Sequence, residues 1–152
     1  MSAVGHFRKC LIQGGSRGIG YEFVKQLLAK PGVDLVVATC RHPDQSENLK
    51  RLQEQYSSRL LCVPLDLTEP ESIASAAEEV NSHVGDDKEF QFLLNSSGFL
   101  HDSSQSMMPE RKVDEVTYEK MLRNFQVEAT QSRDNYQVEF AKLIHQNRTS
   151  IC

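Results

Sequence analysis

The sequence predicts an α/β fold in which a parallel sheet carries helices on both faces. Three observations support this: four short apolar runs rich in β-branched residues, a helical pattern after most of these runs, and a glycine cluster directly after the first. Strands that are buried on both faces read as continuous apolar runs. Strands that alternate with helices are typical of a parallel sheet with right-handed crossovers.

The first half of the chain predicts two strand–helix pairs. Residues 9–12 form a short apolar run that ends at the glycines, as expected for a buried strand that leads into a tight turn. Residues 20–30 have helical apolar spacing and are followed by a Pro-Gly stop signal. Residues 34–40 predict the second strand, and a polar helix is expected over residues 43–56.

The second half continues the alternation. Residues 59–67 predict a third strand, with Pro64 at an edge or near the strand's end because proline cannot donate to a ladder. Thr68 is the expected N-cap of the next helix, with a glutamate three residues later. A fourth strand is expected over residues 89–94, and a further helix over residues 113–129.

Composition and charge exclude several classes of function. The 152 residues carry a net charge of −4 with no run of lysine and arginine, which argues against binding to nucleic acid or a membrane surface. The chain has neither an apolar stretch long enough for a membrane span nor the apolar core of a secretory signal, so a soluble, cytoplasmic protein is expected. The four cysteines form no C-x-x-C pair and predict neither a metal site nor a disulfide framework.

The clearest functional signal is the segment Q-G-G-S-R-G-I-G at residues 13–20, between the first strand and the first helix. A dinucleotide pyrophosphate can approach backbone closely only where no Cβ intervenes, and the helix N-terminus adds free N–H groups and partial positive charge. Gly14, Gly18 and Gly20 are the three Cβ-free positions. The alternative is that these glycines only permit a tight turn. A phosphate-binding P-loop is excluded because no Gly-Lys-Ser/Thr follows.

The spacing G-x-x-x-G-x-G resembles the T-G-x-x-x-G-x-G signature of the short-chain dehydrogenase/reductase family, and in particular its small carbonyl-reductase or C-signal-like members. The resemblance covers about residues 6–129 and implies a Rossmann-type sheet with strand order 3-2-1-4. Asp66 and Leu67 match the family's adenine-binding position after the third strand, and the N-S-S-G segment at residues 95–98 resembles the family's N-N-A-G. The cofactor-binding residues that the resemblance implies are Gly14, Ser16, Arg17, Gly18, Ile19, Gly20, Arg41, Asp66, Leu67, Asn95, Ser96 and Gly98.

The choice of cofactor depends on charge at the end of the second strand. An acidic residue there would accept the ribose 2′-hydroxyl of NAD and repel a 2′-phosphate. This sequence has Arg41 instead, and Arg17 lies in the glycine segment. Two guanidinium groups near one phosphate predict NADP(H) rather than NAD(H). The alternative for Arg41 is an ordinary solvated loop residue.

The proton-transfer residues of the family have no counterpart in these residues. The family uses a serine and a Tyr-x-x-x-Lys pair, in which the lysine lowers the pKa of the tyrosine. No Tyr-x-x-x-Lys follows the fourth strand, and Glu128 stands where the family pattern F-x-V-N has its asparagine. No catalytic residue is therefore predicted. From residue 130 onward the family pattern stops, which divides the chain into an NADP-binding region, 1–129, and a divergent tail, 130–152.

Two hypotheses of function follow. The first is an NADPH-dependent oxidoreductase of carbonyl or hydroxyl compounds, with this chain a truncated or alternatively spliced form and the carbonyl substrate bound only by a longer parent form. The second is a catalytically silent nucleotide-binding or protein-interaction fragment. The family's dimer contact uses its fifth and sixth helices, of which only the first is expected here, so a disrupted oligomer interface is predicted.

Overall fold

The computed structural model describes residues 7–84, 90–98 and 116–132, with side chains as far as residue 128. Four strands form one parallel sheet in the order β3-β2-β1-β4, as predicted. The strands are β1 (Lys9–Gln13), β2 (Leu35–Cys40), β3 (Leu60–Pro64) and β4 (Phe92–Asn95). The helices are α1 (Gly18–Ala29), the short 3-10 turn η1 (Pro43–Gln45), α2 (Glu47–Gln55), α3 (Pro70–Val84) and α4 (Tyr118–Ser132).

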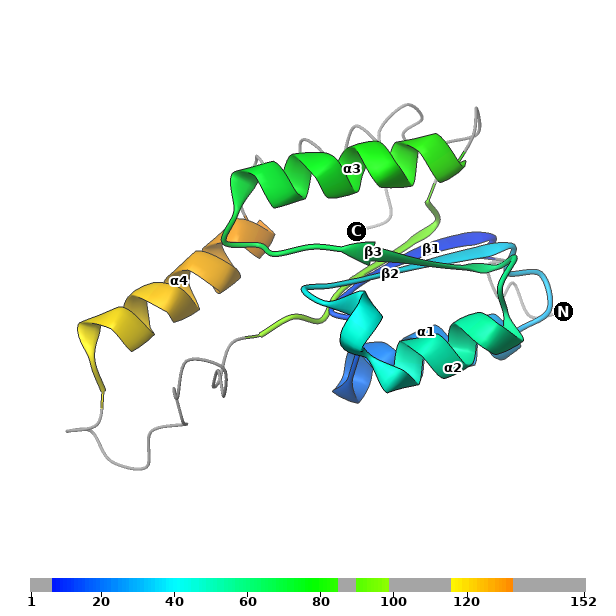
Figure 1. The fold of residues 1–152 in the computed structure, drawn as a ribbon, viewed down its shortest axis with the longest axis horizontal. Coiled ribbons are helices and arrows are strands. Elements are labelled where there is room, and N and C mark those ends of the chain that lie inside the picture. The colour runs from blue at the N-terminus through cyan, green and yellow to red at the C-terminus, as the bar shows by residue number, and fades with distance from the viewer. Residues whose placement is uncertain (1–6, 85–89, 99–115, 133–152) are drawn as a thin grey trace, which may run out of the picture.

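β1 is one of the two inner strands of the described sheet, together with β2. Its residues pair in parallel with β2, from Lys9 opposite Leu35 to Gln13 opposite Thr39. On its other side it pairs with β4, where Leu11 lies opposite Leu93. Because all strands run the same way, their carboxyl ends meet at one end of the sheet, and α4 lies beside that end (Figure 1).

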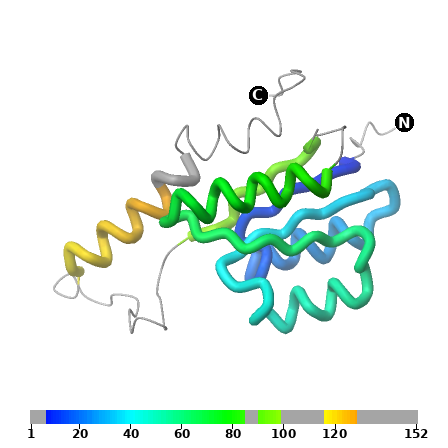
Figure 2. The backbone as a smooth tube through the Cα atoms, turned by 45° about the horizontal axis from the view of Figure 1, so that its top comes forward, coloured from blue at the N-terminus to red at the C-terminus, as the bar shows by residue number. Residues whose placement is uncertain are grey.

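The helices cover the two faces of the sheet in separate layers. α3 lies on one face and α1 with α2 on the other, as both views show (Figures 1 and 2). The α3 face packs around Leu11, Val37 and Val63. The opposite face packs around Ile12, Val36 and the α1 and α2 leucines. Strands β1 and β2 read as continuous apolar runs because both of their faces are covered.

Arg59, just before β3, joins three segments of the α1–α2 face. Its guanidinium group donates to the carbonyl oxygens of Leu28, Lys30 and Val33 at 2.9, 3.2 and 3.0 Å. It also stacks over the Tyr56 ring. The carbonyl groups at the end of α1 are therefore satisfied by a side chain from a distant part of the sequence.

Several predicted element boundaries are wrong. The third strand, expected over residues 59–67, ends at Pro64, which cannot donate to the ladder. α3 begins at Pro70, two residues after the predicted N-cap Thr68, because the Asp66 carboxylate accepts hydrogen bonds from both the Thr68 N–H and its hydroxyl. The polar helix begins only after η1, since the Ser46 hydroxyl caps it by accepting from the Leu49 N–H. The last helix begins at Tyr118 rather than 113.

Some sequence-based predictions lie outside the described residues. These are the start of the predicted fourth strand at residue 89, the loop at 99–111 and most of the tail at 130–152. In the described part of the chain, no helix combines the length and apolar character that a membrane crossing requires. The same residues bring together no group of three histidine, cysteine or acidic side chains suited to hold a metal.

Candidate functional site

A pocket of about 890 Å³ lies at the carboxyl end of the sheet. It is formed by the segments that follow all four strands, and α4 contributes Arg123 and Val127. The volume is in the range of small-molecule and cofactor sites, and its position outside the strands' carboxyl ends is where ligands bind in open α/β sheets. Its lining residues are Gln13, Gly14, Ser16, Arg17, Gly18, Ile19, Thr39, Cys40, Arg41, His42, Gln45, Ser46, Leu65, Asp66, Leu67, Thr68, Ser96, Ser97, Gly98, Arg123 and Val127.

The glycine segment forms a turn that requires glycine at two positions for different reasons. Gly14 has a φ of +85°, a backbone conformation that side chains disfavour. At Gly20 the constraint is space, because a Cβ there would lie 2.1 Å from the carbonyl oxygen of Gly14. The turn is tied to β2 through the Thr39 carbonyl oxygen, which accepts from the N–H groups of Gly14 and Gly15 at 2.9 and 3.0 Å.

The start of α1 presents backbone donors to the pocket. The helix begins at Gly18, and Arg17, at the N-cap position, makes no side-chain capping bond. The first N–H groups of a helix have no partner within the helix, and the first turn of α1 contains no acidic side chain that would neutralise its positive end. Gly18 and Ile19 line the pocket, so this end of α1 is suited to an anionic group.

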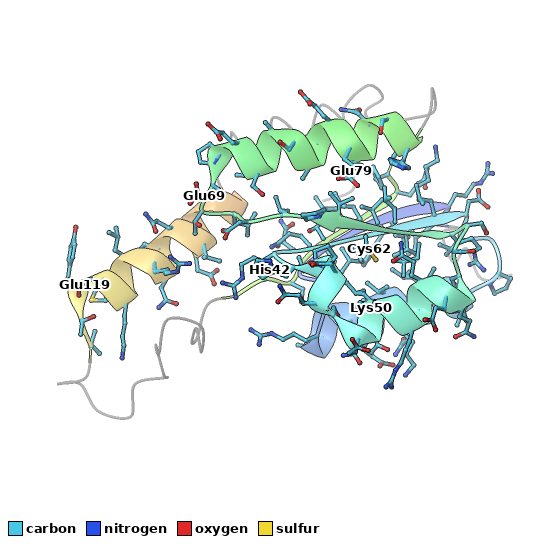
Figure 3. All side chains as sticks on the ribbon, in the orientation of Figure 1. His42, Lys50, Cys62, Glu69, Glu79 and Glu119 are labelled. Carbon is cyan, nitrogen blue, oxygen red and sulfur yellow. The ribbon has the colours of Figure 1, made fainter. Side chains whose placement is uncertain are left out.

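The segment after β2 supplies positive charge and a thiol. Arg41 lines the same pocket as Arg17, and α4 adds Arg123, so three guanidinium groups border one cavity. His42 borders it as well, and Figure 3 shows it at the end of the sheet that faces α4. Burial raises the pKa of the Cys40 thiol, although a hydrogen bond with the Ser16 side chain opposes the shift. The Cys40 thiol is therefore kept neutral and is not an activated nucleophile.

The segment after β3 contains an ordered carboxylate. One Asp66 oxygen accepts from the Thr68 N–H at 2.9 Å and from the Thr68 hydroxyl at 2.7 Å. The Asp66 N–H donates to the Ser72 hydroxyl at 2.9 Å. Leu65 and Leu67 on either side are buried, so the backbone is held from both directions. This arrangement gives Asp66 a fixed position on the pocket wall.

The segment after β4 closes the pocket from the other side of β1. The Ser96 N–H donates to the Gln13 carbonyl oxygen at 2.9 Å, which continues the β1–β4 ladder past the end of the strand. A Cβ at Gly98 would lie 3.6 Å from a Glu128 carboxylate oxygen. Glu128, which occupies the position of the family's asparagine, is thus close to this segment.

The structure brings ten of the twelve predicted cofactor-binding residues together around one pocket. Two do not line the pocket. Gly20 lies beneath the glycine turn and shapes it from below, and Asn95 is the exposed last residue of β4. The others border the one cavity.

Sequence reasoning missed several lining residues. Gln13, Thr39 and Leu65 lie within or next to the apolar runs that predict strands. Only the register of the strands shows which strand ends reach the pocket. Arg123 and Val127 reach the pocket only because of the way α4 packs. The hydrophobic pattern of a single helix does not reveal that packing. His42 and Ser46 follow Arg41 closely, so an extension of the predicted loop by five residues would have found them.

Comparisons with known proteins agree with this geometry. The short chain dehydrogenase family model matches residues 8–131. A 2,3-dihydro-2,3-dihydroxybenzoate dehydrogenase of Vibrio cholerae is 31% identical over 108 residues, which is 71% of this chain and 40% of that protein. Salutaridine reductase of Papaver somniferum is 32% identical over 94 residues, 60% of this chain and 29% of that protein.

Solved structures give the same result for the fold. The crystal structure of NADPH-bound carbonyl reductase from chicken fatty liver superposes with a TM-score of 0.73 at 27% identity, and the match covers 91% of this chain and 48% of that one. The chain therefore spans about half the length of this structural relative, and less of the two curated relatives. Since the family model covers most of the sequence, the chain belongs to the short-chain dehydrogenase/reductase family.

Proposed function

We propose that this chain binds NADP(H) in the pocket at the carboxyl end of the sheet. The observation that carries the proposal is the convergence of three features on one cavity: a turn whose glycines lack Cβ atoms, the N–H groups at the start of α1, and the guanidinium groups of Arg17 and Arg41. The first two suit a pyrophosphate, and Arg17 with Arg41 suits a 2′-phosphate. The chicken carbonyl reductase, which was solved with NADPH, supports the same cofactor class.

The residues present fit a dinucleotide. The Thr39 hydroxyl is buried at the pocket wall and has no hydrogen-bond partner among the residues that the structure describes. A buried polar atom in that state is costly unless a ligand or water satisfies it. The proposed binding residues are the twelve predicted from the sequence, within the region 1–129. The 130–152 tail is proposed to lie outside this binding region.

The proposed role of each binding residue follows from its chemical type. Bound NADPH would supply a hydride. In this proposal Gly14, Gly18 and Ile19 bind the pyrophosphate, Asp66 and Leu67 orient the adenine, and Arg17 with Arg41 hold the 2′-phosphate. The 152 residues contain no Tyr-x-x-x-Lys after β4 to supply the accompanying proton. We therefore propose cofactor binding without turnover for these residues, and reduction of small carbonyl compounds for a longer cytoplasmic form.

Titration of the purified chain with NADPH and NADH, followed by nicotinamide fluorescence, tests the proposal. We expect NADPH to bind at least tenfold more tightly, and Arg41→Asp to remove most of that preference. Lys50→Asp on the outer side of α2 is the matched control and should leave the preference unchanged. Tighter binding of NADH, or an unchanged preference in Arg41→Asp, would refute the choice of NADP(H).

A turnover assay with the same protein separates the two hypotheses of function. We expect no NADPH consumption with a panel of aldehydes and ketones at protein concentrations that show binding. Turnover would overturn the proposal that these residues bind without catalysis. Absence of binding would overturn the proposed function as a whole.

A further inference from the structure

Gln13 ends β1 with a buried amide that the function described above does not use. The residue is 2% exposed, and its side chain reaches across to the segment that follows β4. Its Nε2 group donates to the Ser97 hydroxyl, and its Oε1 atom accepts from the Ser97 N–H at 3.4 Å. One side chain thus contacts both the backbone and the side chain of Ser97. A buried, two-point contact of this kind fixes geometry because its groups lose their solvent when they pair.

The two segments joined by this pair are fitted closely to each other. A Cβ at Gly14 would lie 2.7 Å from the Ser97 hydroxyl and 2.9 Å from the Ser97 nitrogen. A Cβ at Gly20 would lie 3.3 Å from the Ser96 hydroxyl. The glycine turn therefore rests directly against residues 96–97, and a small shift of either segment changes the shape of the pocket between them.

The segment after β4 follows an edge strand of the described sheet. β4 pairs with β1 alone among the described strands, whereas β1 has a neighbour on each side. Beyond the strand, the Ser96 N–H to Gln13 carbonyl bond is the last rung of the ladder. The position of residues 96–98 relative to the glycine turn thus depends strongly on Gln13.

Gln13 and Ser97 are also two of the three positions, with Ser96, at which this chain departs from the two family signatures that they occupy. Gln13 stands at the threonine of T-G-x-x-x-G-x-G, and Ser97 at the alanine of N-N-A-G. The two departures contact each other. A glutamine is long enough to cross from β1 to the neighbouring segment, and a serine offers a hydroxyl acceptor that alanine lacks.

We propose that Gln13 and Ser97 form a positioning pair that holds the segment after β4 against the glycine turn, and that the affinity for a dinucleotide depends on it. Both act through the backbone they fix. The inference rests on the proposed function. It predicts that the pair affects the affinity for a ligand that contacts both segments. The affinity for a ligand confined to the adenosine side should not depend on the pair.

A double-mutant cycle tests the pair with Gln13→Thr, Ser97→Ala and the combined variant. The probes are NADPH, which spans both segments, and adenosine 2′-monophosphate, which lacks the pyrophosphate that the glycine turn would hold. We expect each single substitution to weaken NADPH binding about three- to tenfold, as for loss of one buried hydrogen bond. The combined variant should bind no more weakly than Gln13→Thr alone, because Gln13→Thr already removes the side-chain bond that Ser97→Ala removes.

The second probe separates positioning from general destabilisation. Adenosine 2′-monophosphate should bind all three variants within about twofold of the unsubstituted chain. Gln26→Thr on the exposed side of α1 and Ser82→Ala on α3 are controls of the same chemistry away from the pocket. Each should leave NADPH binding unchanged.

The outcomes are distinguishable. Normal NADPH binding by the variants, multiplied effects in the combined variant, or equal loss of both ligands would each overturn the positioning pair while leaving the proposed function in place. Failure of the unsubstituted chain to bind NADPH would overturn the proposed function and this inference with it. If Gln13→Thr does not fold, Ser97→Ala alone decides between the first results through the two probes.

Discussion

The two sides of β1 differ in how completely they are packed. On the β2 side, Val36, Val37 and Ala38 are all fully buried between α3 and the α1–α2 layer. On the β4 side, partly buried and exposed positions alternate, and Leu93 remains 39% exposed. The pocket takes its glycine turn, Arg17 and Arg41 from the packed side, and its opposite wall, with Arg123 of α4, from the open one.

α4 extends this contrast. Its residues Arg123 and Val127 face the pocket, and Val127 packs against the α3-side core. Apolar side chains on its other side face solvent, with Phe125 65% exposed. Figure 1 shows the helix extending away from the sheet. The glycine turn and the start of α1 thus lie where the fold is closely packed, whereas the opposite wall of the pocket lies where side chains remain partly exposed.

The largest expected contrast is between two leucines. Leu28→Ala removes a fully buried side chain from the α1–α2 layer and should lower the free energy of unfolding by about 2–5 kcal/mol. Leu93→Ala, on the open side, should cost less than about 1 kcal/mol, because its side chain is already partly solvated. Urea denaturation followed by circular dichroism measures both. Similar losses at the two positions would remove the distinction between the sides.

A second contrast compares two glycines of the turn, one required because a Cβ would collide with backbone and one favoured by its backbone conformation. Gly20→Ala should destabilise the chain by about 1–3 kcal/mol, since the added Cβ collides with the Gly14 carbonyl oxygen. Gly18→Ala should cost about 1 kcal/mol, because only its φ of +60° is unfavourable and no atom lies within 4 Å of the new Cβ. Thermal unfolding of the two variants checks the order. A larger loss for Gly18→Ala would contradict the packing of the turn.

The smallest expected effect is a pH dependence carried by the packed side. Burial raises the pKa of both Cys10 and Cys62 to about 11, from an ordinary value near 9. Between those values the unfolded chain releases thiol protons that the folded chain retains. The free energy of unfolding should therefore fall as pH rises from 9 to 11, by about 1 kcal/mol or more. A Cys10→Ala, Cys62→Ala variant should lose this extra slope, and an unchanged slope would refute the role of the thiols.

Sequence patterns predicted the parts of the fold that depend on local order. Continuous apolar runs identified β1 and β2, and the Pro-Gly signal placed the end of α1 within one residue. The glycine spacing located the turn that shapes the pocket. The Thr68 cap failed because a side chain two residues earlier, Asp66, captured its hydroxyl. Such competition between neighbouring side chains leaves no periodic signal.

The missed parts of the site depend on contacts between distant segments. Gln13 reads as the end of an apolar strand, and only its contact with Ser97, 84 residues later, shows that it joins two walls of the pocket. Arg59 likewise looks like an ordinary surface residue until the structure places it at the end of α1. Neither contact follows from composition or spacing.

The central claim is that the segments after all four strands form one NADP(H) site. Amide chemical shifts of the isotope-labelled chain, recorded during a titration with NADP⁺, test it most directly. We predict saturable shifts concentrated at residues 14–20, 41–46, 66–68 and 96–98, with little change along the outer side of α2 or at the amino ends of the strands. Absence of saturable shifts, or shifts confined to the opposite end of the sheet, would contradict the claim.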